Sequence, residues 1–391
     1  MPSNLIHCEI LLLAAMFAGT NAASQMAVSS SLSIVDSAED IDKSILPLID
    51  YMEFHALPVG QGDCTMIRCP GPNEYIVIVD CGSSGGNRFT PQQVEYYLRP
   101  LINQVVAIII THPDRDHFNY LPSINWNKGN IQAVIIGGTL QDYYKPTSPD
   151  FDKIYKWLQE FQNQGKLQLI NNGQSCIGNC PVYNFCGLSN TQFDILAANV
   201  GTRSNEKSIV MKVSHNQFSM LLAGDVEGSA ATSIANTLGA QLQSTVYKIA
   251  HHGASRLANS VTWLTPIEPY SAFASSAYNF GNCRHPRCEA IRRIENLRTI
   301  VQADDHAFYC GNSAGQNPTD YPRYDLSIYA TSPTPNMICI LVYQSSYHLF
   351  NDCDNLLRPS HDFVAFNEED PCPDEDKEEI DWYYDWFYYS E

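Results

Sequence analysis

The chain has 391 residues, of which 44% are hydrophobic, so it can bury a sizeable core, and a fully disordered or fibrous protein is excluded. Its formal net charge of −19, from 42 acidic and 23 basic residues, opposes a role as a high-affinity nucleic-acid packager. The charge is uneven, because residues 368–391 contain eleven acids and one lysine, a net of −10, which leaves about −9 for the other residues.

The N-terminal apolar segment ILLLAAMFAG is followed by TNAAS, a pattern typical of a secretory signal peptide cleaved near residues 22 to 24. The apolar run is shorter than the roughly 20 residues that span a bilayer. No Lys or Arg precedes it, so a membrane anchor stays open as the alternative. We expect a signal peptide at 1–23, a flexible lead-in at 24–46, and a secreted, extracellular protein without a stable membrane anchor.

Thirteen cysteines are present, and Cys8 lies in the expected signal peptide, which leaves an even twelve. This parity suits an oxidising compartment, and no C-x2-C pair repeats with zinc spacing, so structural disulfides are favoured over a zinc ribbon. Several neighbours could close local loops: Cys64 with Cys69, Cys176 with Cys180 or Cys186, and Cys283 with Cys288.

From residue 47 to residue 355 we expect one layered domain. Short apolar runs bounded by Gly, Pro or Asn predict strands within 51–59, 64–69, 75–82, 105–112, 131–138, 193–198, 208–213, 218–225 and 246–253. Helical spacing predicts helices within 92–103, 148–164, 227–241 and 288–296. Buried strands with interleaved helices indicate an α/β domain.

The tail at 356–391 is acidic and aromatic and has no apolar periodicity. We expect it to lie outside the folded domain as a solvated segment. A segment that binds a partner is the alternative.

The strand predicted at 105–110 runs into THPDRDH. In extended backbone His112, Asp114 and Asp116 would project to one side, and His117 would break the alternation where the chain turns into a helix. Converging nitrogen and oxygen donors suit a divalent ion such as Zn²⁺ or Mn²⁺. Taken alone, the motif could also be a hydrogen-bonded turn that caps a strand.

Two further strand ends carry similar side chains. In LLAGD, Gly224 permits close backbone approach, and Asp225 could bridge two cations. In AHHG, the adjacent His251 and His252 point in different directions, so one can bind metal while the other meets the substrate or donates a proton.

In their order and separations, YIVIVDCG, THPDRDH, LLAGD and AHHGAS resemble the motifs of the metallo-β-lactamase fold hydrolases. FHALPVGQGDCTMI, SNEKSIVMKV and FGNCRHP resemble more narrowly the metallo-hydrolase domain of the ComEC-type DNA-uptake proteins. The resemblance covers roughly residues 50 to 310. It implies a four-layer αβ/βα sandwich with a dinuclear site for Zn²⁺ or Mn²⁺ at one edge of the paired sheets.

The resemblance also implies roles for individual residues. His112 and Asp114 would hold one metal; Asp116, His117 and His252 would hold the other; and Asp225 would bridge them. His251 remains an alternative to His252 as the ligand.

Outside the ligand set, the resemblance implies that Asp80 supports the ligand loop through hydrogen bonds. His285 would line the substrate cleft, with Asp63 nearby. Asp116, His251 and His285 are our candidates for catalytic residues.

The sequence departs from the usual HxHxDH motif, because Asp114 stands in place of the second histidine, a variation shared with the ComEC-type group. Between His117 and Asp225 no histidine suits the position that many members fill. His215, in VSHNQF, is expected to be exposed in a hairpin turn. We therefore expect the first metal to bind more weakly, or the enzyme to work with one tightly held ion.

The function implied is that of a metal-dependent phosphodiesterase or nuclease that uses a metal-activated water, with single-stranded nucleic acid as a candidate substrate. Arg115, Arg256, Arg284 and Arg287 are close in sequence to the site and could bind phosphate. Two alternatives stay open: a hydrolase of a lactone, thioester or phosphocholine ester, and a catalytically inactive secreted binding protein on the same fold. The sequence does not predict the oligomeric state.

Overall fold

The computed structural model describes residues 51–86, 89–255, 257–277, 284–297, 299–307, 310–311, 323–331, 337–343 and 346–350. The expected signal peptide, lead-in and tail lie outside these residues, as do Cys283 and Arg256. Contacts divide the chain between residues 32 and 33, and every described residue lies in the second unit. Within the described ranges no helix combines the length and the apolar character needed to cross a membrane.

The first sheet has eight strands, and most of its residues are buried. Its order is β18 (Ser346–Phe350), β17 (Ile338–Tyr343), β1 (Tyr51–Ala56), β2 (Thr65–Arg68), β3 (Ile76–Val79), β4 (Val105–Ile110), β5 (Ala133–Ile136) and β6 (Leu167–Leu169). Strands β3 to β6 are parallel. The runs IVIV of β3 and VVAIII of β4 are buried throughout, as is typical of parallel strands covered on both faces.

The second sheet also has a parallel half. Its order is β16 (Ile328–Ala330), β13 (Ser271–Ala274), β12 (Val246–Lys248), β11 (Phe218–Leu222), β10 (Val210–His215), β9 (Thr191–Ala198) and β7 (Cys176–Ile177), with β8 (Val182–Tyr183) also paired to β9. Strands β11, β12, β13 and β16 are parallel. A separate pair is formed by β14 (Gln302–Ala307) and β15 (Arg323–Leu326).

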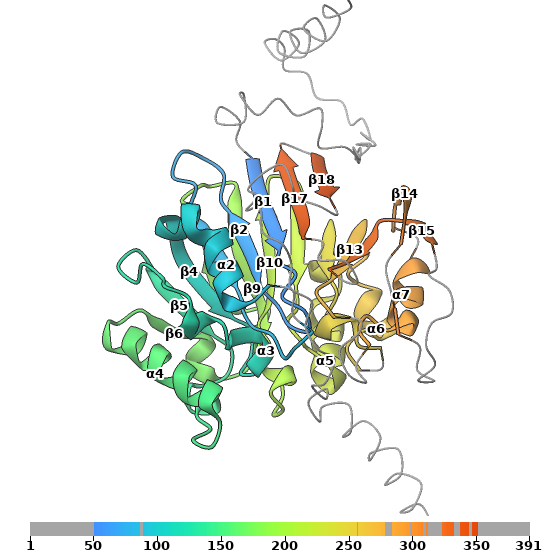
Figure 1. Ribbon diagram of the computed structural model, residues 1–391. Helices are drawn as coiled ribbons and strands as arrows, with labels where there is room; N and C mark the ends of the chain where they lie inside the picture. The colour runs from blue at the N-terminus through green and yellow to red at the C-terminus, as the bar shows by residue number, and fades with distance from the viewer. Residues whose placement is uncertain are drawn as a thin grey trace, which may run out of the picture. The chain divides into compact units, whose positions relative to one another are not determined.

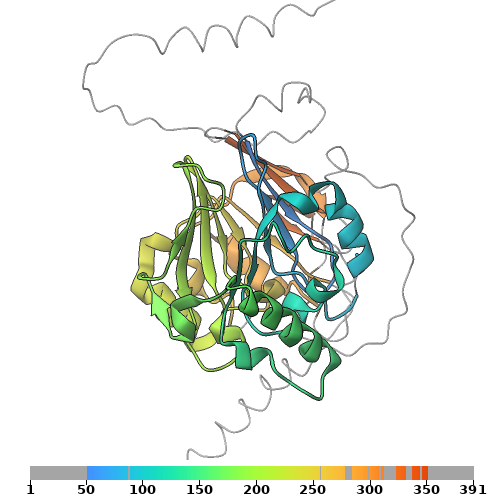
Figure 2. The ribbon, with the colours of Figure 1, turned by 90° about the vertical axis from the view of Figure 1, so that its left-hand side faces the viewer.

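Helices cover the outer faces of both sheets (Figures 1 and 2). α2 (Pro91–Leu98) and α4 (Pro149–Asn163) pack on the first sheet, whereas α5 (Gly228–Leu238), α6 (Val261–Leu264) and α7 (Cys288–Glu295) pack on the second. Between the sheets, the rings of Phe54 and Phe218 lie 5.5 Å apart. The fold is therefore the predicted four-layer αβ/βα sandwich.

Short helical turns complete the layers. They are α3 (Arg115–Phe118) and the 3-10 turns η3 (Arg99–Gln104), η4 (Leu121–Ser123), η5 (Leu140–Tyr143), η6 (Ile170–Gly173), η7 (Asn205–Lys207), η8 (Gly239–Leu242) and η9 (His251–Gly253). Two of them, α3 and η9, contain candidate metal ligands.

Every run predicted as a strand contains one, and each predicted helix contains one. The prediction that His215 is exposed was wrong. β10 and β11 do form a hairpin, but His215 is fully buried and its Nδ1 lies 2.8 Å from the hydroxyl of Thr191 on the neighbouring strand β9. The pairing with β9 covers the hairpin end and thereby buries the ring.

Among the described residues four disulfides form, and one of them, Cys176–Cys180, closes a predicted local loop. The other predicted neighbours pair elsewhere. Cys64 bonds Cys81, Cys69 bonds Cys186, and Cys288 bonds Cys310. Sequence proximity failed here because the fold brings together cysteines that are 17 to 117 residues apart.

Candidate metal centre

The candidate ligands lie where parallel strands of both sheets end. β4 leads into His112, β11 leads into Asp225, and β12 leads into His251 and His252. The carboxyl ends of parallel strands meet at one edge of a sheet, where ligands commonly bind. Gly224 has a φ of +54°, and a Cβ there would lie 2.9 Å from the Ser208 hydroxyl, so a side chain at this position would push Asp225 out of place.

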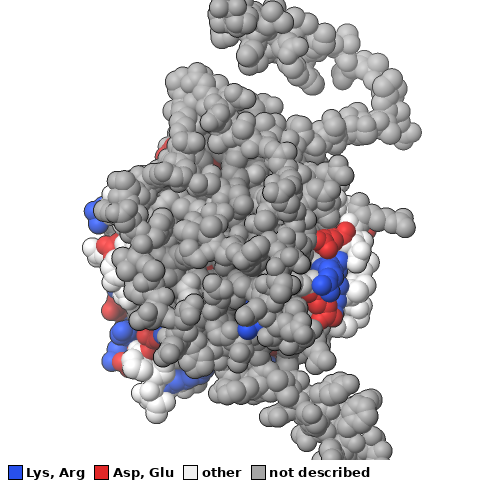
Figure 3. Space-filling model, turned by 45° about the vertical axis from the view of Figure 1, so that its right-hand side comes forward, with Lys and Arg blue, Asp and Glu red and all other residues white. Residues whose placement is uncertain are grey.

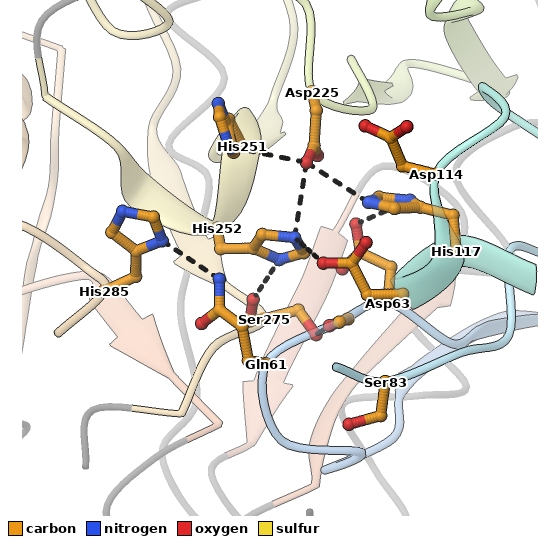
Figure 4. Close-up of polar contacts among 12 residues, drawn as sticks. Gln61, Asp63, Ser83, Asp114, His117, Asp225, His251, His252, Ser275 and His285 are labelled. Carbon is orange, nitrogen blue, oxygen red and sulfur yellow. Dashed lines mark hydrogen bonds and ion pairs between the residues drawn. The ribbon is translucent and has the colours of Figure 1, made fainter. Parts of the chain in front are cut away.

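Asp225 is the centre of the cluster. Its Oδ2 lies 3.2 Å from Nε2 of His117, 3.3 Å from that of His252, 3.9 Å from that of His251 and 4.0 Å from that of His112. Figure 4 shows Asp225 joined to His117, His251 and His252. With Asp225, these residues come from three different segments. The cluster thus brings together the three regions that the sequence analysis singled out.

Hydrogen bonds show that Nδ1 of both His112 and His117 carries a proton. The Thr111 hydroxyl donates to Asp80 Oδ2 at 2.8 Å, so it can only accept from His112 Nδ1, 3.0 Å away. His117 Nδ1 donates to the same carboxylate at 2.9 Å. Asp80 also accepts from the backbone N–H of Thr111 at 2.7 Å. Both rings therefore carry a proton on Nδ1 and turn Nε2 toward Asp225.

The same arrangement recurs on the other side of the cluster. His252 Nδ1 donates to the carbonyl of Ser275 at 2.8 Å, and His251 Nδ1 donates to Glu227 Oε2 at 3.1 Å. Metal-binding histidines usually donate their second N–H to a carbonyl or carboxylate in this way. His252 is also 3.3 Å from Asp116 Oδ2, which favours it over His251 as the partner of Asp116.

The residues fit a divalent cation. Nε2 of His112, His117 and His252 and Oδ1 of Asp225 are all buried and make no hydrogen bond. Two atoms bound at about 2.1 Å to one tetrahedral ion lie roughly 3.4 Å apart, close to the spacings around Asp225 Oδ2. Groups of ligand atoms that could hold an ion include His112 with His117 and Asp225, and Asp116 with His117 and His252.

The cluster has a strongly negative field. Burial would lower the pKa of His117, yet the carboxylates of Asp225 and Asp80 hold that pKa well above its usual range. Burial likewise opposes protonation of His252, but Asp225 and Asp116 raise its pKa to about 10. A field that attracts protons to buried imidazoles also attracts divalent cations, which would compete for the same nitrogens.

Asp114 and Asp116 flank these histidines. Asp114 Oδ2 lies 3.3 Å from His112 Nε2 and accepts from the Ser204 hydroxyl at 3.0 Å. The predicted extended alternation ends at Asp114, because Asp116 already lies in helix α3 with His117. The turn, rather than alternation, directs Asp116 toward His252.

The backbone is strained at three of these positions. Asp80, His251 and His252 have φ angles of +55°, +49° and +52°, a region that residues with a Cβ rarely adopt. Such strain of about 1–3 kcal/mol per residue clusters at functional sites. The local sequence does not favour these conformations, so the packed surroundings must hold them.

A buried ion pair lies beside the cluster. Asp63, from the loop after β1, accepts from the Lys248 ammonium on β12, and its Oδ2 is 3.7 Å from His117 Nδ1. Burial would raise the pKa of Asp63 and lower that of Lys248, but each group's charge reverses the shift in the other. The Lys248 ammonium places one positive charge near the carboxylates, and Asp63 balances it, so the pair as a whole is neutral.

His285 also reaches the site. Its ring centroid lies 5.8 Å from that of His251 and 6.3 Å from that of His252, and Gln61 Nε2 lies 3.1 Å from its Nδ1. Burial, with the neighbouring histidines and Arg287, holds the pKa of His285 well below its usual range, so this ring is neutral.

The arginines are less concentrated than expected. Arg115 is half exposed and forms an ion pair with Asp150 at 2.6 Å. Arg287 is tied by its backbone N–H to the Gly253 carbonyl at 2.9 Å. Within the described residues, the predicted metal ligands lie close together, whereas these contacts of Arg115 and Arg287 do not form a phosphate-binding group.

Sequence reasoning missed several residues that orient the ligands: Gln61, Ser204, Glu227, Lys248 and Ser275. A signal existed for Lys248, because a lysine interrupts the otherwise apolar run VYKIA. For the other four, nothing in the local sequence distinguishes them from ordinary turn residues.

Comparisons with known proteins agree with a metallo-β-lactamase fold. Residues 57–124 match the family model described as "Metallo-beta-lactamase superfamily". The chain is 21% identical over 295 residues to ComE operon protein 3 of Bacillus subtilis (strain 168), and the match covers 70% of this chain and 35% of that protein. The chain thus spans about a third of the curated relative.

Two solved structures show weaker similarity. The metallo-β-lactamase fold protein YhfI from Bacillus subtilis is 10% identical, with a TM-score of 0.37 and coverage of 63% of this chain and 94% of that one. CmlA, a diiron β-hydroxylase from Streptomyces venezuelae, is 12% identical, with a TM-score of 0.33 and coverage of 58% and 45%. The family match over residues 57–124, together with the four-layer sandwich, agrees with the predicted metallo-β-lactamase fold.

Proposed function

We propose that this chain is a secreted, metal-dependent phosphodiesterase or nuclease whose metals are held by His112, Asp114, Asp116, His117, Asp225 and His252. The observation that carries the proposal is the convergence of buried histidine Nε2 atoms on Asp225 Oδ2. An inactive binding protein would not need several buried imidazoles turned toward one buried carboxylate, because burying such polar groups is costly.

Two Zn²⁺ or Mn²⁺ ions at this site would lower the pKa of water toward about 7 and stabilise negative charge on the scissile group. The chain's own residues prepare the site. Asp80 and the Ser275 carbonyl hold the rings of His117 and His252, and the Ser204 hydroxyl holds the Asp114 carboxylate. Glu227 holds His251 beside Asp225, where its ring can meet the substrate.

A phosphodiester substrate is supported by the motifs shared with ComEC-type DNA-uptake proteins and by the match to ComE operon protein 3. Single-stranded nucleic acid is our first candidate. In Figure 3, the described residues on this face carry acidic and basic side chains close together rather than a broad basic area. We therefore expect moderate affinity with contacts near the scissile group.

Secretion is supported by the leader pattern and by the disulfides of the described residues, which are typical of oxidising compartments. The expected outcome is a mature protein in the medium that starts near residue 23, measured by the intact mass.

The function is tested with the purified full chain on single-stranded DNA, bis-p-nitrophenyl phosphate, a lactone and a thioester. We expect cleavage of the two phosphodiesters and its loss in Asp225→Asn. Asp194→Asn is the control, because Asp194 lies in β9, outside the proposed ligand set. Cleavage of only the lactone or thioester would contradict the substrate class, and full activity of Asp225→Asn would contradict the metal mechanism.

A further inference from the structure

His285 and Gln61 meet at the wall of the metal cluster. Gln61 comes from the loop between β1 and β2, and His285 from the segment before α7. Gln61 Nε2 and His285 Nδ1 are 3.1 Å apart, and only 4% and 3% of the two residues are exposed. Figure 4 shows this contact beside His251 and His252.

The contact determines where the proton of His285 sits. An amide NH₂ group can only donate, so His285 Nδ1 must accept from Gln61. A neutral imidazole has one N–H, which then lies on Nε2. This tautomer is opposite to that of His252, whose Nδ1 donates to the Ser275 carbonyl. His252 can therefore bind a metal through Nε2, whereas His285 offers a hydrogen-bond donor there.

Among the described residues the donor has no acceptor. His285 Nε2 is buried and makes no hydrogen bond there, although its ring centroid lies 5.8 Å from that of His251 and 6.3 Å from that of His252. A buried N–H without an acceptor is destabilising, and a hydrogen bond to a bound oxygen atom would remove that cost. A phosphoryl oxygen of a substrate at the metal cluster is an acceptor of suitable chemistry.

Both backbone segments are fixed, so the contact is built into the fold. Gln61 exchanges backbone hydrogen bonds with the loop after β3, donating to Gly85 at 2.9 Å and accepting from Ser84 at 2.6 Å. On the other side, the backbone of Arg287 donates to Gly253, next to His252, at 2.9 Å.

We propose that Gln61 is a positioning residue that fixes His285 as an Nε2–H donor, and that His285 donates this hydrogen bond to a phosphoryl oxygen of the substrate. The second half of this statement rests on the proposed function, whereas the tautomer does not.

The tautomer is measured directly by long-range ¹H–¹⁵N correlation spectra of the metal-free full chain. We expect a protonated Nε2 and an unprotonated Nδ1 at His285. In Gln61→Glu, a carboxylate of nearly the same shape can only accept, so Nδ1 should become protonated. A protonated Nδ1 in the wild-type protein would overturn the proposal, because Gln61 would then accept through Oε1.

Kinetics with the metal-loaded protein test the donor role. His285→Asn, which lacks a donor near the Nε2 position, should lower kcat by on the order of 10²-fold with unchanged metal content. His285→Gln places an amide N–H near that position and should lose less. Equal losses in both variants, or loss of metal from either, would overturn the role. His215→Gln is the control for altering a buried histidine away from the cluster.

An experiment with inorganic phosphate distinguishes a failure of this proposal from a failure of the proposed function. If the wild-type chain cleaves no phosphodiester, the proposed function fails, but phosphate added to the zinc-loaded protein should still shift the His285 Nε2–H resonance. No shift at saturating phosphate would overturn the donor role, whatever the substrate.

Discussion

The proton positions on the histidines distinguish possible ligands from other polar residues at this site. Nδ1 of His112, His117 and His252 is engaged with an oxygen acceptor, and Nε2 of each is buried without a hydrogen bond. His55, also fully buried, differs because both of its ring nitrogens have partners, Tyr97 and Glu53. Burial alone would not distinguish these rings from His55; the orientation of their Nε2 atoms toward Asp225, at 3.2 to 4.0 Å, does.

Close backbone contacts also matter at this scale. A Cβ at Gly82 would lie 2.7 Å from the carbonyl carbon of Asp116 and from the backbone nitrogen of Phe118. Gly82→Ala should therefore displace the turn that carries Asp116 and His117. We expect at least a 10-fold weaker metal affinity by isothermal titration, because misplaced ligands typically cost 10–100-fold.

Gly129→Ala is the matched control, since a Cβ there meets only the side chain of Asn127, at 3.3 Å. We expect its metal affinity to equal that of the wild-type protein. An unchanged affinity in Gly82→Ala would show that the turn does not depend on this contact.

At the scale of single elements, β1 and β2 are joined by a buried charge cluster. Glu53 lies opposite Arg68 in the register, and its carboxylate also contacts Nε2 of His55 at 3.0 Å. Burial would raise the pKa of Glu53, but the hydrogen bond from His55 and the charges of His55 and Arg68 bring that pKa below its ordinary value.

A depressed pKa means that the folded state binds the proton of Glu53 less tightly than the unfolded state does. The resulting stabilisation is complete above the unfolded pKa of about 4.5 and is lost as the pH falls through the lower folded pKa. Glu53→Gln should lower the free energy of unfolding by about 1.5–3 kcal/mol at pH 7 and flatten its decline below pH ~4.5. Urea unfolding at several pH values measures both effects.

Glu74→Gln serves as the comparison, because Glu74 also pairs with Arg68, at 2.5 Å, but its side chain is 42% exposed. We expect a loss of less than about 1 kcal/mol. Equal losses in the two variants would contradict the role assigned to burial of Glu53.

Apolar runs predicted the strands that carry the ligands, because β3, β4, β11 and β12 are buried and end in turn residues. The apolar run ICILVY of β17 has the same pattern, although the predicted strands did not include it. β13 and β16 contain apolar stretches of only three residues, 272–274 and 328–330, each bounded by serine or threonine, which is shorter than the runs that predicted the other strands. Their pairing with β12 and with each other, not their local sequence, makes them strands.

Across the whole domain, the Asp63–Lys248 pair ties the two sheets together at the site. Asp63 follows β1 of the first sheet, Lys248 ends β12 of the second, and both are almost fully buried. Asp63 also donates its backbone N–H to the carbonyl of Asp116 at 3.1 Å. The pair therefore links the two halves of the ligand set.

Lys248→Met should lower the free energy of unfolding of the metal-free chain by about 3–5 kcal/mol, because it leaves a buried carboxylate without its partner. The double variant Asp63→Asn with Lys248→Met should recover part of that loss. Denaturant unfolding measures both. A double variant whose loss equals the sum of the two single losses would contradict a direct interaction between the two charges.

The sequence predicted which strand ends bring the candidate ligands together, since His112, Asp225 and His252 each follow an apolar run. It could not predict the contacts between distant segments that orient them. Gln61 and His285 are 224 residues apart, and Asp63 and Lys248 are 185 apart. Such pairs depend on how the two sheets face each other, and no local pattern encodes that.

The most direct test is the metal content of the purified full chain after loading with Zn²⁺ or Mn²⁺ and dialysis, measured by inductively coupled plasma mass spectrometry. The dinuclear site predicts about two ions per chain, and Asp225→Asn should lose most of that content because Asp225 lies between the ligand sets. Asp194→Asn should match the wild-type protein. A wild-type chain that retains no metal, or an Asp225→Asn variant that retains all of it, would contradict the proposed metal centre.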